Sequence, residues 1–188
     1  MFHKLIEEFL SEDECNSIID LGKSSDMKRM RSSKFKNGIL VNSKIEYEGN
    51  KRLGCYFTST EDFPILRSLT EKTINLINRL IPFNSIQYTD IQNFSFNKYS
   101  PGDFLDWHSD DHEILKGATL TCIYQLNQDY KGGEILILEG QKEIYIEKKR
   151  GSIFIFDPKI PHSIKSVDEG ERYSINSWPS SVKIKGLI

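Results

Sequence analysis

Residues 152–156 read SIFIF, and residues 172–178 read RYSINSW. Both runs are short and rich in β-branched and aromatic side chains, and glycine or proline stands close to their ends, as is typical of strands. Four further runs from residue 86 onward share this character: IQYTDIQNFSFNKY, ATLTCIYQLN, GEILIL and EIYIE. Six or more short strands that follow two helical segments predict an α+β protein, in which helices support a β-sandwich or jelly roll.

The helices are expected in the first half of the chain. Ser11 and Glu14 have the spacing of a capping box, so a helix should begin there, and Gly22 is a plausible end for it. After Pro64, apolar side chains recur every three to four residues as far as Leu80. This spacing predicts a second, longer helix.

The whole chain of 188 residues is expected to form one domain, since 38% hydrophobic and 28% charged residues are ordinary for a globular protein. Residues 1–85 would supply the supporting helices and a flap, and residues 86–179 the jelly-roll core. The window 24–52 holds eight Lys or Arg against three Asp or Glu. It reads either as a solvated hairpin or as a basic flap that grips a substrate.

Composition excludes several classes of protein. Cys15, Cys55 and Cys122 are odd in number and contain no CxxC pair, which argues against a disulfide framework and favours a reducing, cytoplasmic compartment. We expect no secretory signal and no membrane partner, because no apolar run approaches the roughly 20 residues that span a bilayer. The net charge of −2 is not that of a dedicated nucleic-acid binder. The sequence does not indicate the oligomeric state.

The hexapeptide WHSDDH contains the densest group of metal-ligand residue types in the chain. In an extended segment residues i and i+2 share a face, so His108 and Asp110 can present an imidazole and a carboxylate together. Asp106 and His112 fall on the same face by that rule, and alternation alone does not choose among them. The remaining imidazole of the strand half, His162, is the natural third ligand.

Two imidazoles and one carboxylate leave open positions on a metal. This set is typical of non-haem Fe(II) oxygenases, and the same donors could hold zinc. Arg172 follows ten residues after His162, and strand alternation directs it to the same face as Ser174 and Asn176. A buried guanidinium needs an anion, which would be either a carboxylate ligand or a structural Asp or Glu.

The motifs YSPGDFLDWHSDDH, LTCIYQLNQDYKGGEILI and GSIFIFDPKIPHSIKSVDEGERYSINSW resemble those of the Fe(II)/2-oxoglutarate-dependent dioxygenases, in particular the prolyl 4-hydroxylase-like branch. The resemblance covers roughly residues 88 to 179, and FLSEDECNSII resembles the opening helix of that branch. It implies a double-stranded β-helix (jelly roll), with Fe(II) and 2-oxoglutarate as cofactors, O₂ as cosubstrate and ascorbate as a candidate auxiliary reductant.

Carried over by position, the resemblance implies that His108, Asp110 and His162 are the iron ligands. It also implies that Arg172 binds the far carboxylate of 2-oxoglutarate and that Tyr99 lines the cosubstrate pocket.

Asp111 and His112 then become turn residues or supporting residues, and Trp178 matches a family aromatic near the site. The sequence departs from the family pattern at Gln125, where oxygen-sensing prolyl hydroxylases tend to carry tyrosine. Arg172 replaces the lysine of the collagen-type enzymes.

The resemblance implies hydroxylation of a prolyl residue in a protein or peptide, with release of succinate and CO₂. A nucleic-acid demethylase or a small-molecule or amino-acid oxygenase of the same superfamily is the alternative enzyme, and nucleic acid therefore stays open as a partner. Against the demethylase, position 178 is Trp where that branch usually has a second arginine. A cupin-like metal-binding protein without catalysis is the alternative of a different class.

Overall fold

The computed structural model describes residues 2–30, 34–36, 39–41, 50–58, 62–81, 86–110 and 120–183. Asp111, His112 and much of the basic window 24–52 therefore lie outside the described residues, and so does the role predicted for that window as a flap.

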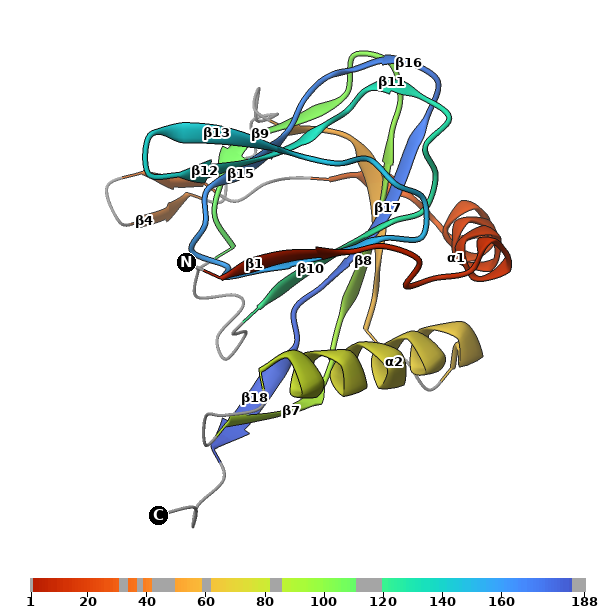
Figure 1. Cartoon of the computed structure of the whole chain (residues 1–188). Coiled ribbons are helices and arrows are strands. Elements are labelled where there is room, and N and C mark those ends of the chain that lie inside the picture. Colours follow the sequence, from red (N-terminus) through yellow and green to blue (C-terminus); the bar gives the residue numbers. More distant parts are fainter. Residues whose placement is uncertain are drawn as a thin grey trace.

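Two antiparallel sheets face each other (Figure 1). The major sheet has the strand order β1 (His3–Ile6), β14 (Ile153–Phe156), β10 (Thr121–Gln125), β17 (Arg172–Ser177), β8 (Phe94–Tyr99), β6 (Leu53–Phe57) and β2 (Lys28–Arg29). The minor sheet has the order β13 (Lys142–Ile146), β12 (Ile135–Glu139), β15 (His162–Ile164), β9 (Phe104–His108) and β5 (Asn50–Lys51). Three two-stranded pairs complete the fold: β11 (Lys131–Gly132) with β16 (Val167–Glu169), β7 (Ile86–Asp90) with β18 (Ser180–Lys183), and β3 (Lys34–Lys36) with β4 (Ile39–Val41).

Helix α1 (Glu12–Ser24) packs on the outer face of the major sheet (Figure 1). Its first turn has the predicted capping box: the Ser11 backbone N–H donates to Glu14 Oε2 at 2.8 Å, and the Glu14 N–H donates to Ser11 Oγ at 3.2 Å. Gly22 was predicted to end this helix. This prediction is wrong, because Gly22 lies within the helix. A Cβ at Gly22 would stand 2.4 Å from the Phe96 ring, so the glycine permits the close approach of helix and sheet.

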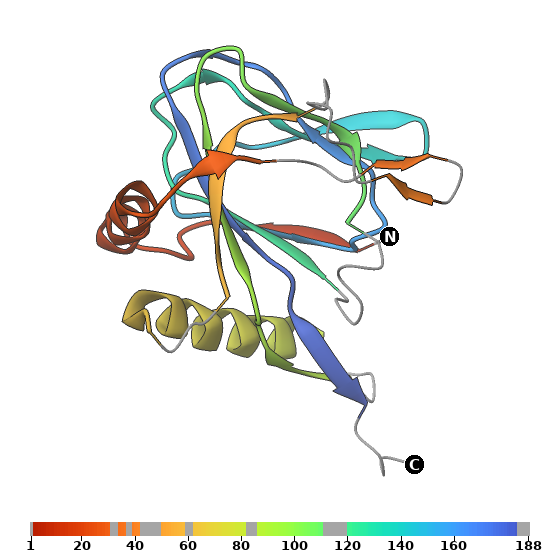
Figure 2. The same cartoon turned by 180° about the vertical axis from the view of Figure 1, so that it is seen from behind.

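Helix α2 (Pro64–Leu80) has the predicted bounds and packs on the same outer face. Thr73 on its buried side is hydrogen-bonded to the Tyr124 hydroxyl of β10 at 2.8 Å. Asn78 pairs with the backbone of Tyr88 through both its amide nitrogen and its amide oxygen, each at 2.9 Å. This contact fixes β7 beside the helix, and Figure 2 shows the β7–β18 pair projecting from the sandwich.

The structure has two apolar cores. One lies between the helices and the outer face of the major sheet, and the other between the inner faces of the two sheets. In β8, β10 and β17, the register places nine side chains on the inner face of the major sheet: Ser95, Asn97 and Tyr99 of β8, Thr121, Ile123 and Gln125 of β10, and Arg172, Ser174 and Asn176 of β17. Phe154 and Phe156 of β14 share this face. Apolar members of this face pack against Leu105, Ile135, Ile137 and Ile164 of the minor sheet. The inner face is therefore apolar toward β14 and polar toward β17 and β8.

This architecture agrees with the predicted jelly roll supported by helices. Strands β1 and β6 of the major sheet were not predicted: residues 1–85 contribute these strands as well as the helices. In the part of the chain that the structure describes, neither helix has the length and apolar composition needed to cross a membrane.

Candidate functional site

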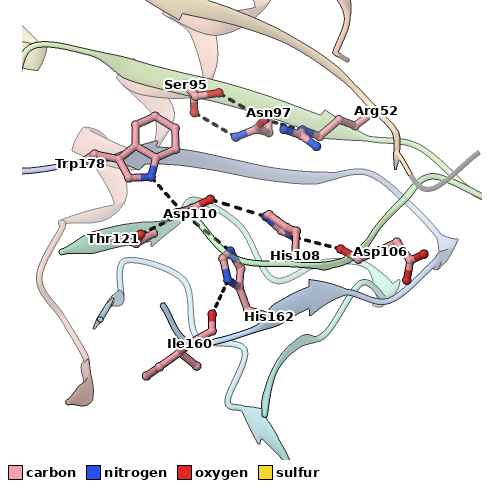
Figure 3. A network of polar contacts seen from close by, with 10 residues as sticks. All are labelled: Arg52, Ser95, Asn97, Asp106, His108, Asp110, Thr121, Ile160, His162 and Trp178. Atoms are coloured by element: carbon pink, nitrogen blue, oxygen red, sulfur yellow. Dashed lines mark hydrogen bonds and ion pairs between the residues drawn. The ribbon is translucent and has the colours of Figure 1, made fainter. Parts of the chain in front are cut away.

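Three ligand-type side chains come together at one end of the minor sheet (Figure 3). His108 is the last residue of β9, Asp110 follows two residues later, and His162 is the first residue of β15. His108 and His162 lie directly opposite each other in the register, with ring centroids 4.1 Å apart. One donor atom from each of the three side chains lies within 4.8 Å of the others, which is close enough to share a metal ion.

A β-bulge in β9 decides which side chains face the interior. The register pairs His162 with His108 and Ile164 with Leu105, so β9 has one extra residue between these pairs. Leu105 is consequently buried and His108 faces His162, while Asp106 between them is exposed. The alternation rule had left Asp106 and Asp110 as equal candidates, and the structure places Asp110 with the two imidazoles.

Both imidazoles are held by backbone carbonyls. Nδ1 of His108 lies 2.9 Å from the Asp106 carbonyl oxygen, and Nδ1 of His162 lies 3.0 Å from that of Ile160. A carbonyl oxygen only accepts, so Nδ1 carries the proton in each neutral ring and the lone pair is left on Nε2. Burial, and next the neighbouring His162, lower the pKa of His108 to about 4, which keeps this ring neutral and able to bind a metal at neutral pH.

Asp110 is buried, and one of its two carboxylate oxygens accepts two hydrogen bonds. Its Oδ2 accepts hydrogen bonds from Thr121 Oγ1 and from Trp178 Nε1, both at 2.9 Å. Burial alone would raise the pKa of this carboxyl. The two histidines, and the hydrogen bonds from Trp178 and Thr121, together hold the pKa of Asp110 below its usual range. The side chain is therefore a carboxylate at neutral pH.

Arg172 is fully buried on the inner face of the major sheet. Its Nη1 donates to Ser174 Oγ at 3.0 Å and its Nη2 to Gln125 Oε1 at 3.2 Å, while the buried Nε has no hydrogen-bond partner. The predicted alternative, an ion pair with a core carboxylate, is not found among the described residues. A buried cation with neutral partners and a free N–H is suited to an anionic ligand.

Aromatic side chains frame this guanidinium. Tyr99 lies opposite Arg172 in the register, with the guanidinium carbon 5.1 Å from the ring centroid. The Tyr130 hydroxyl accepts from Gln125 Nε2 at 2.6 Å, and burial raises the pKa of Tyr130 even though Arg172 lies beside it. A Cβ at Gly133 would come within 3.1 Å of the Arg172 side chain, so a glycine here leaves room for the arginine stem.

Two residues that contact the site, Arg52 and Thr121, were missed from the sequence. Arg52 lies between β5 and β6, and its Nε donates at 2.8 Å to Oδ1 of the fully buried Asn97 (Figure 3). The guanidinium carbon of Arg52 also lies 5.9 Å from the centroid of the Tyr99 ring. The positive charge of Arg52 helps to lower the pKa of His108. Alternation along β10 could have identified Thr121, because it shares a face with Gln125.

A model of the 2OG-Fe(II) oxygenase superfamily matches residues 94–180, which include the three clustered ligands and Arg172. By this match, residues 94–180 are similar to 2OG-Fe(II) oxygenase domains. The cofactors of this oxygenase family are Fe(II) and 2-oxoglutarate, the pair predicted from the sequence. The two imidazoles and carboxylate suit the metal, and the unpartnered N–H of Arg172 suits the cosubstrate's second carboxylate.

Two curated relatives of this chain are PKHD-type hydroxylases. That of Crocosphaera subtropica is 24% identical over 127 residues, which cover 63% of this chain and 57% of the relative. That of Alteromonas mediterranea is 26% identical over 96 residues, covering 46% and 42%. The chain thus spans about half the length of these relatives.

Solved structures share the oxygenase fold. A Pseudomonas putida prolyl-4-hydroxylase superimposes with a TM-score of 0.72 at 16% identity, over 95% of this chain and 91% of that one. The viral collagen prolyl hydroxylase of Paramecium bursaria Chlorella virus-1, in its 2OG complex, gives 0.68 at 17% identity over 97% of both chains. A Trichoplax adhaerens prolyl hydroxylase in complex with a hypoxia inducible factor peptide fragment gives 0.69 at 17% identity over 95% and 83%. The predicted double-stranded β-helix is confirmed.

Proposed function

We propose that this chain is an Fe(II)- and 2-oxoglutarate-dependent dioxygenase that hydroxylates a prolyl residue in a protein or peptide. The observation that carries the proposal is the combination of two imidazoles and a carboxylate with a buried arginine that has no anionic partner among the described residues. The family assignment of residues 94–180 supports the reaction class.

In this proposal His108, Asp110 and His162 bind the iron. The backbone carbonyls that hold the two Nδ1–H groups keep Nε2 of each ring directed at the metal, which spares the cost of rotating the rings on binding. Three protein ligands leave the other positions for cosubstrate and O₂. When bound, the iron and 2-oxoglutarate together supply the oxidation of a C–H bond by O₂, with release of succinate and CO₂.

Arg172 and Tyr99 would hold the far carboxylate of 2-oxoglutarate. The guanidinium offers its unpartnered Nε–H to the carboxylate, and the Tyr99 ring packs against the guanidinium. Charge balance supports this assignment, since Fe(II) adds two positive charges and 2-oxoglutarate two negative ones. The buried pair Asp110 and Arg172 is then neutral in sum with or without the cofactors. A metal store has no use for such an arginine, which argues against the cupin-like alternative.

The prolyl substrate is proposed from the neighbours. Structures of similar fold include prolyl hydroxylases, one of them in complex with a peptide fragment, and the curated relatives are hydroxylases. Trp178 occupies the position where a nucleic-acid demethylase of the superfamily would usually carry a second arginine, and its indole is committed to Asp110.

The first experiment is an anaerobic titration of the protein with Fe(II) and then 2-oxoglutarate, following the visible charge-transfer band of the chelate. We expect a band in the wild type that is absent from His108→Ala. A wild type that binds metal but gives no band would refute the oxygenase assignment.

The second experiment tests the substrate. Proline-containing peptides are incubated aerobically with the loaded protein, and their mass is followed for the gain of one oxygen atom, with matched peptides that carry alanine in place of proline as controls. Oxidation of the proline peptides alone supports the proposal. Oxidation of a methylated oligonucleotide, or of a free amino acid, with no peptide product would assign the alternative substrate class.

A further inference from the structure

One oxygen of Asp110 is occupied by two protein donors. Thr121 Oγ1 and Trp178 Nε1 both donate to Oδ2 at 2.9 Å (Figure 3). Oδ1 lies 3.7 Å from Nε2 of His108 and Oδ2 lies 3.8 Å from Nε2 of His162, so it is the two hydrogen bonds on Oδ2 that distinguish the oxygens. A carboxylate oxygen has two lone-pair directions, and two donors fill both of them. We propose that Thr121 and Trp178 form a clamp that leaves Oδ1 as the single metal-binding atom of Asp110. This inference rests on the proposed function.

The two donors come from the opposite sheet. Cys122 of β10 is paired with Ser177 of β17, so Thr121, one residue earlier, and Trp178, one residue later, lie at the same end of neighbouring strands. Asp110 follows β9 of the minor sheet, and the clamp therefore connects the two layers across the site. Thr121 is fully buried, so its hydroxyl has no access to water as a substitute partner.

The clamp has a chemical consequence for the metal. If Asp110 bound through both oxygens, it would take a fourth position on the ion. Too few positions would then remain for the two oxygens of 2-oxoglutarate and the one that must stay open. Holding Oδ2 away from the metal keeps the three protein ligands to three positions. Thr121 and Trp178 are thus positioning residues that act through Asp110 on the room available to the cosubstrate.

The test removes the donors and keeps the shapes. Thr121→Val replaces the hydroxyl by a methyl group, Trp178→Phe keeps an aromatic ring without the N–H, and the double variant combines them. Co(II)-loaded proteins are compared by visible absorption, which reports the coordination of the ion without turnover, and 2-oxoglutarate affinity is measured by anaerobic titration of the Fe(II) form. We expect the double variant to bind Co(II) with an altered spectrum and to bind 2-oxoglutarate at least about tenfold more weakly.

Two controls separate the clamp from a structural role. Thr121→Ser keeps the hydroxyl and should match the wild type in both measurements. Trp107→Phe removes the chain's other, exposed tryptophan and should leave the Co(II) spectrum unchanged. If the double variant does not fold, the single variant Trp178→Phe tests the clamp. It should then show an altered Co(II) spectrum and weaker 2-oxoglutarate binding, with smaller changes than those expected of the double variant.

A folded double variant whose Co(II) spectrum and 2-oxoglutarate affinity equal those of the wild type would overturn the clamp and leave the proposed function standing. A wild type that binds neither metal would overturn both.

Discussion

Replacing Arg172 by methionine should separate its role in folding from its role in binding. In the metal-free protein the guanidinium is buried against neutral partners, with one N–H unsatisfied. An apolar side chain of similar length removes that desolvated charge, which often stabilises by about 1–4 kcal/mol. The loss leaves the acceptors Ser174 and Gln125 without a donor at a cost of about 1 kcal/mol each. The two effects nearly cancel, so we expect a melting temperature within about 3 °C of the wild type.

The binding effect is much larger. Truncating one partner of a buried, charged hydrogen-bonded pair costs about 2–5 kcal/mol, so Arg172→Met should weaken 2-oxoglutarate binding by roughly 100-fold. At a concentration of 100 times the wild-type Kd, the ligand stabilises the wild type by about 2.7 kcal/mol and such a variant by about 0.4 kcal/mol. In a domain of this size these values correspond to shifts in melting temperature of about 5–10 °C and about 1 °C.

The assay is thermal unfolding of the proteins in the presence of Mn(II), with and without 2-oxoglutarate; manganese replaces iron here so that no turnover is expected. Arg150→Met is the matched control, because Arg150 also has a buried Nε without a partner but binds Glu12 and Asn16 of the first helix, away from the site. It should keep the full shift on adding 2-oxoglutarate. A full shift in Arg172→Met would refute the assignment of this residue to the cosubstrate.

Three other predictions concern the metal, the pH dependence and the core. His162→Ala should abolish Fe(II) binding in equilibrium dialysis and His112→Ala should largely preserve it; the opposite pattern would overturn the ligand set. The pKa of His108 is lower in the folded chain, about 4, than the usual unfolded value near 6.5, so the unfolded state takes up the proton first. The metal-free protein should therefore lose on the order of 2 kcal/mol as the pH falls from 6.5 to 4, and urea unfolding of His108→Asn should show a flatter dependence. Gly22→Ala should destabilise by about 1–3 kcal/mol in urea, because the new methyl would meet the Phe96 ring at 2.4 Å, and an unchanged midpoint would contradict this packing.

Local signals in the sequence predicted the helices well. The capping box of Ser11 and Glu14 and the apolar spacing behind Pro64 involve residues within one or two turns, and both helices begin where these signals stand. Gly22 was misinterpreted as a helix end, because its reason is tertiary contact with Phe96, which no local pattern contains. Strands β1 and β6 were missed for the same reason, since their partners lie far away in the chain.

The site was predicted in its residue types but not in its geometry. Alternation could not choose between Asp106 and Asp110, because the choice depends on a bulge that exists only in the register of β9 against β15. The donors to Asp110 come from the other sheet. Alternation along β10 places Thr121 on the face of Gln125, but no local pattern indicates its contact with Asp110. The ligand roles and the reducing compartment inferred from the cysteines stay predictions.

The pairing of His108 with His162 has a consequence for folding kinetics. These residues are distant in the chain and meet only when β9 and β15 pair. This pairing requires closure of a long segment that contains the five strands β10 to β14. A metal ion has no complete set of ligands before that step, so it cannot guide the early stages of folding. Capture of the ion during refolding would instead mark the moment at which β9 and β15 pair, and its rate would time this long-range step.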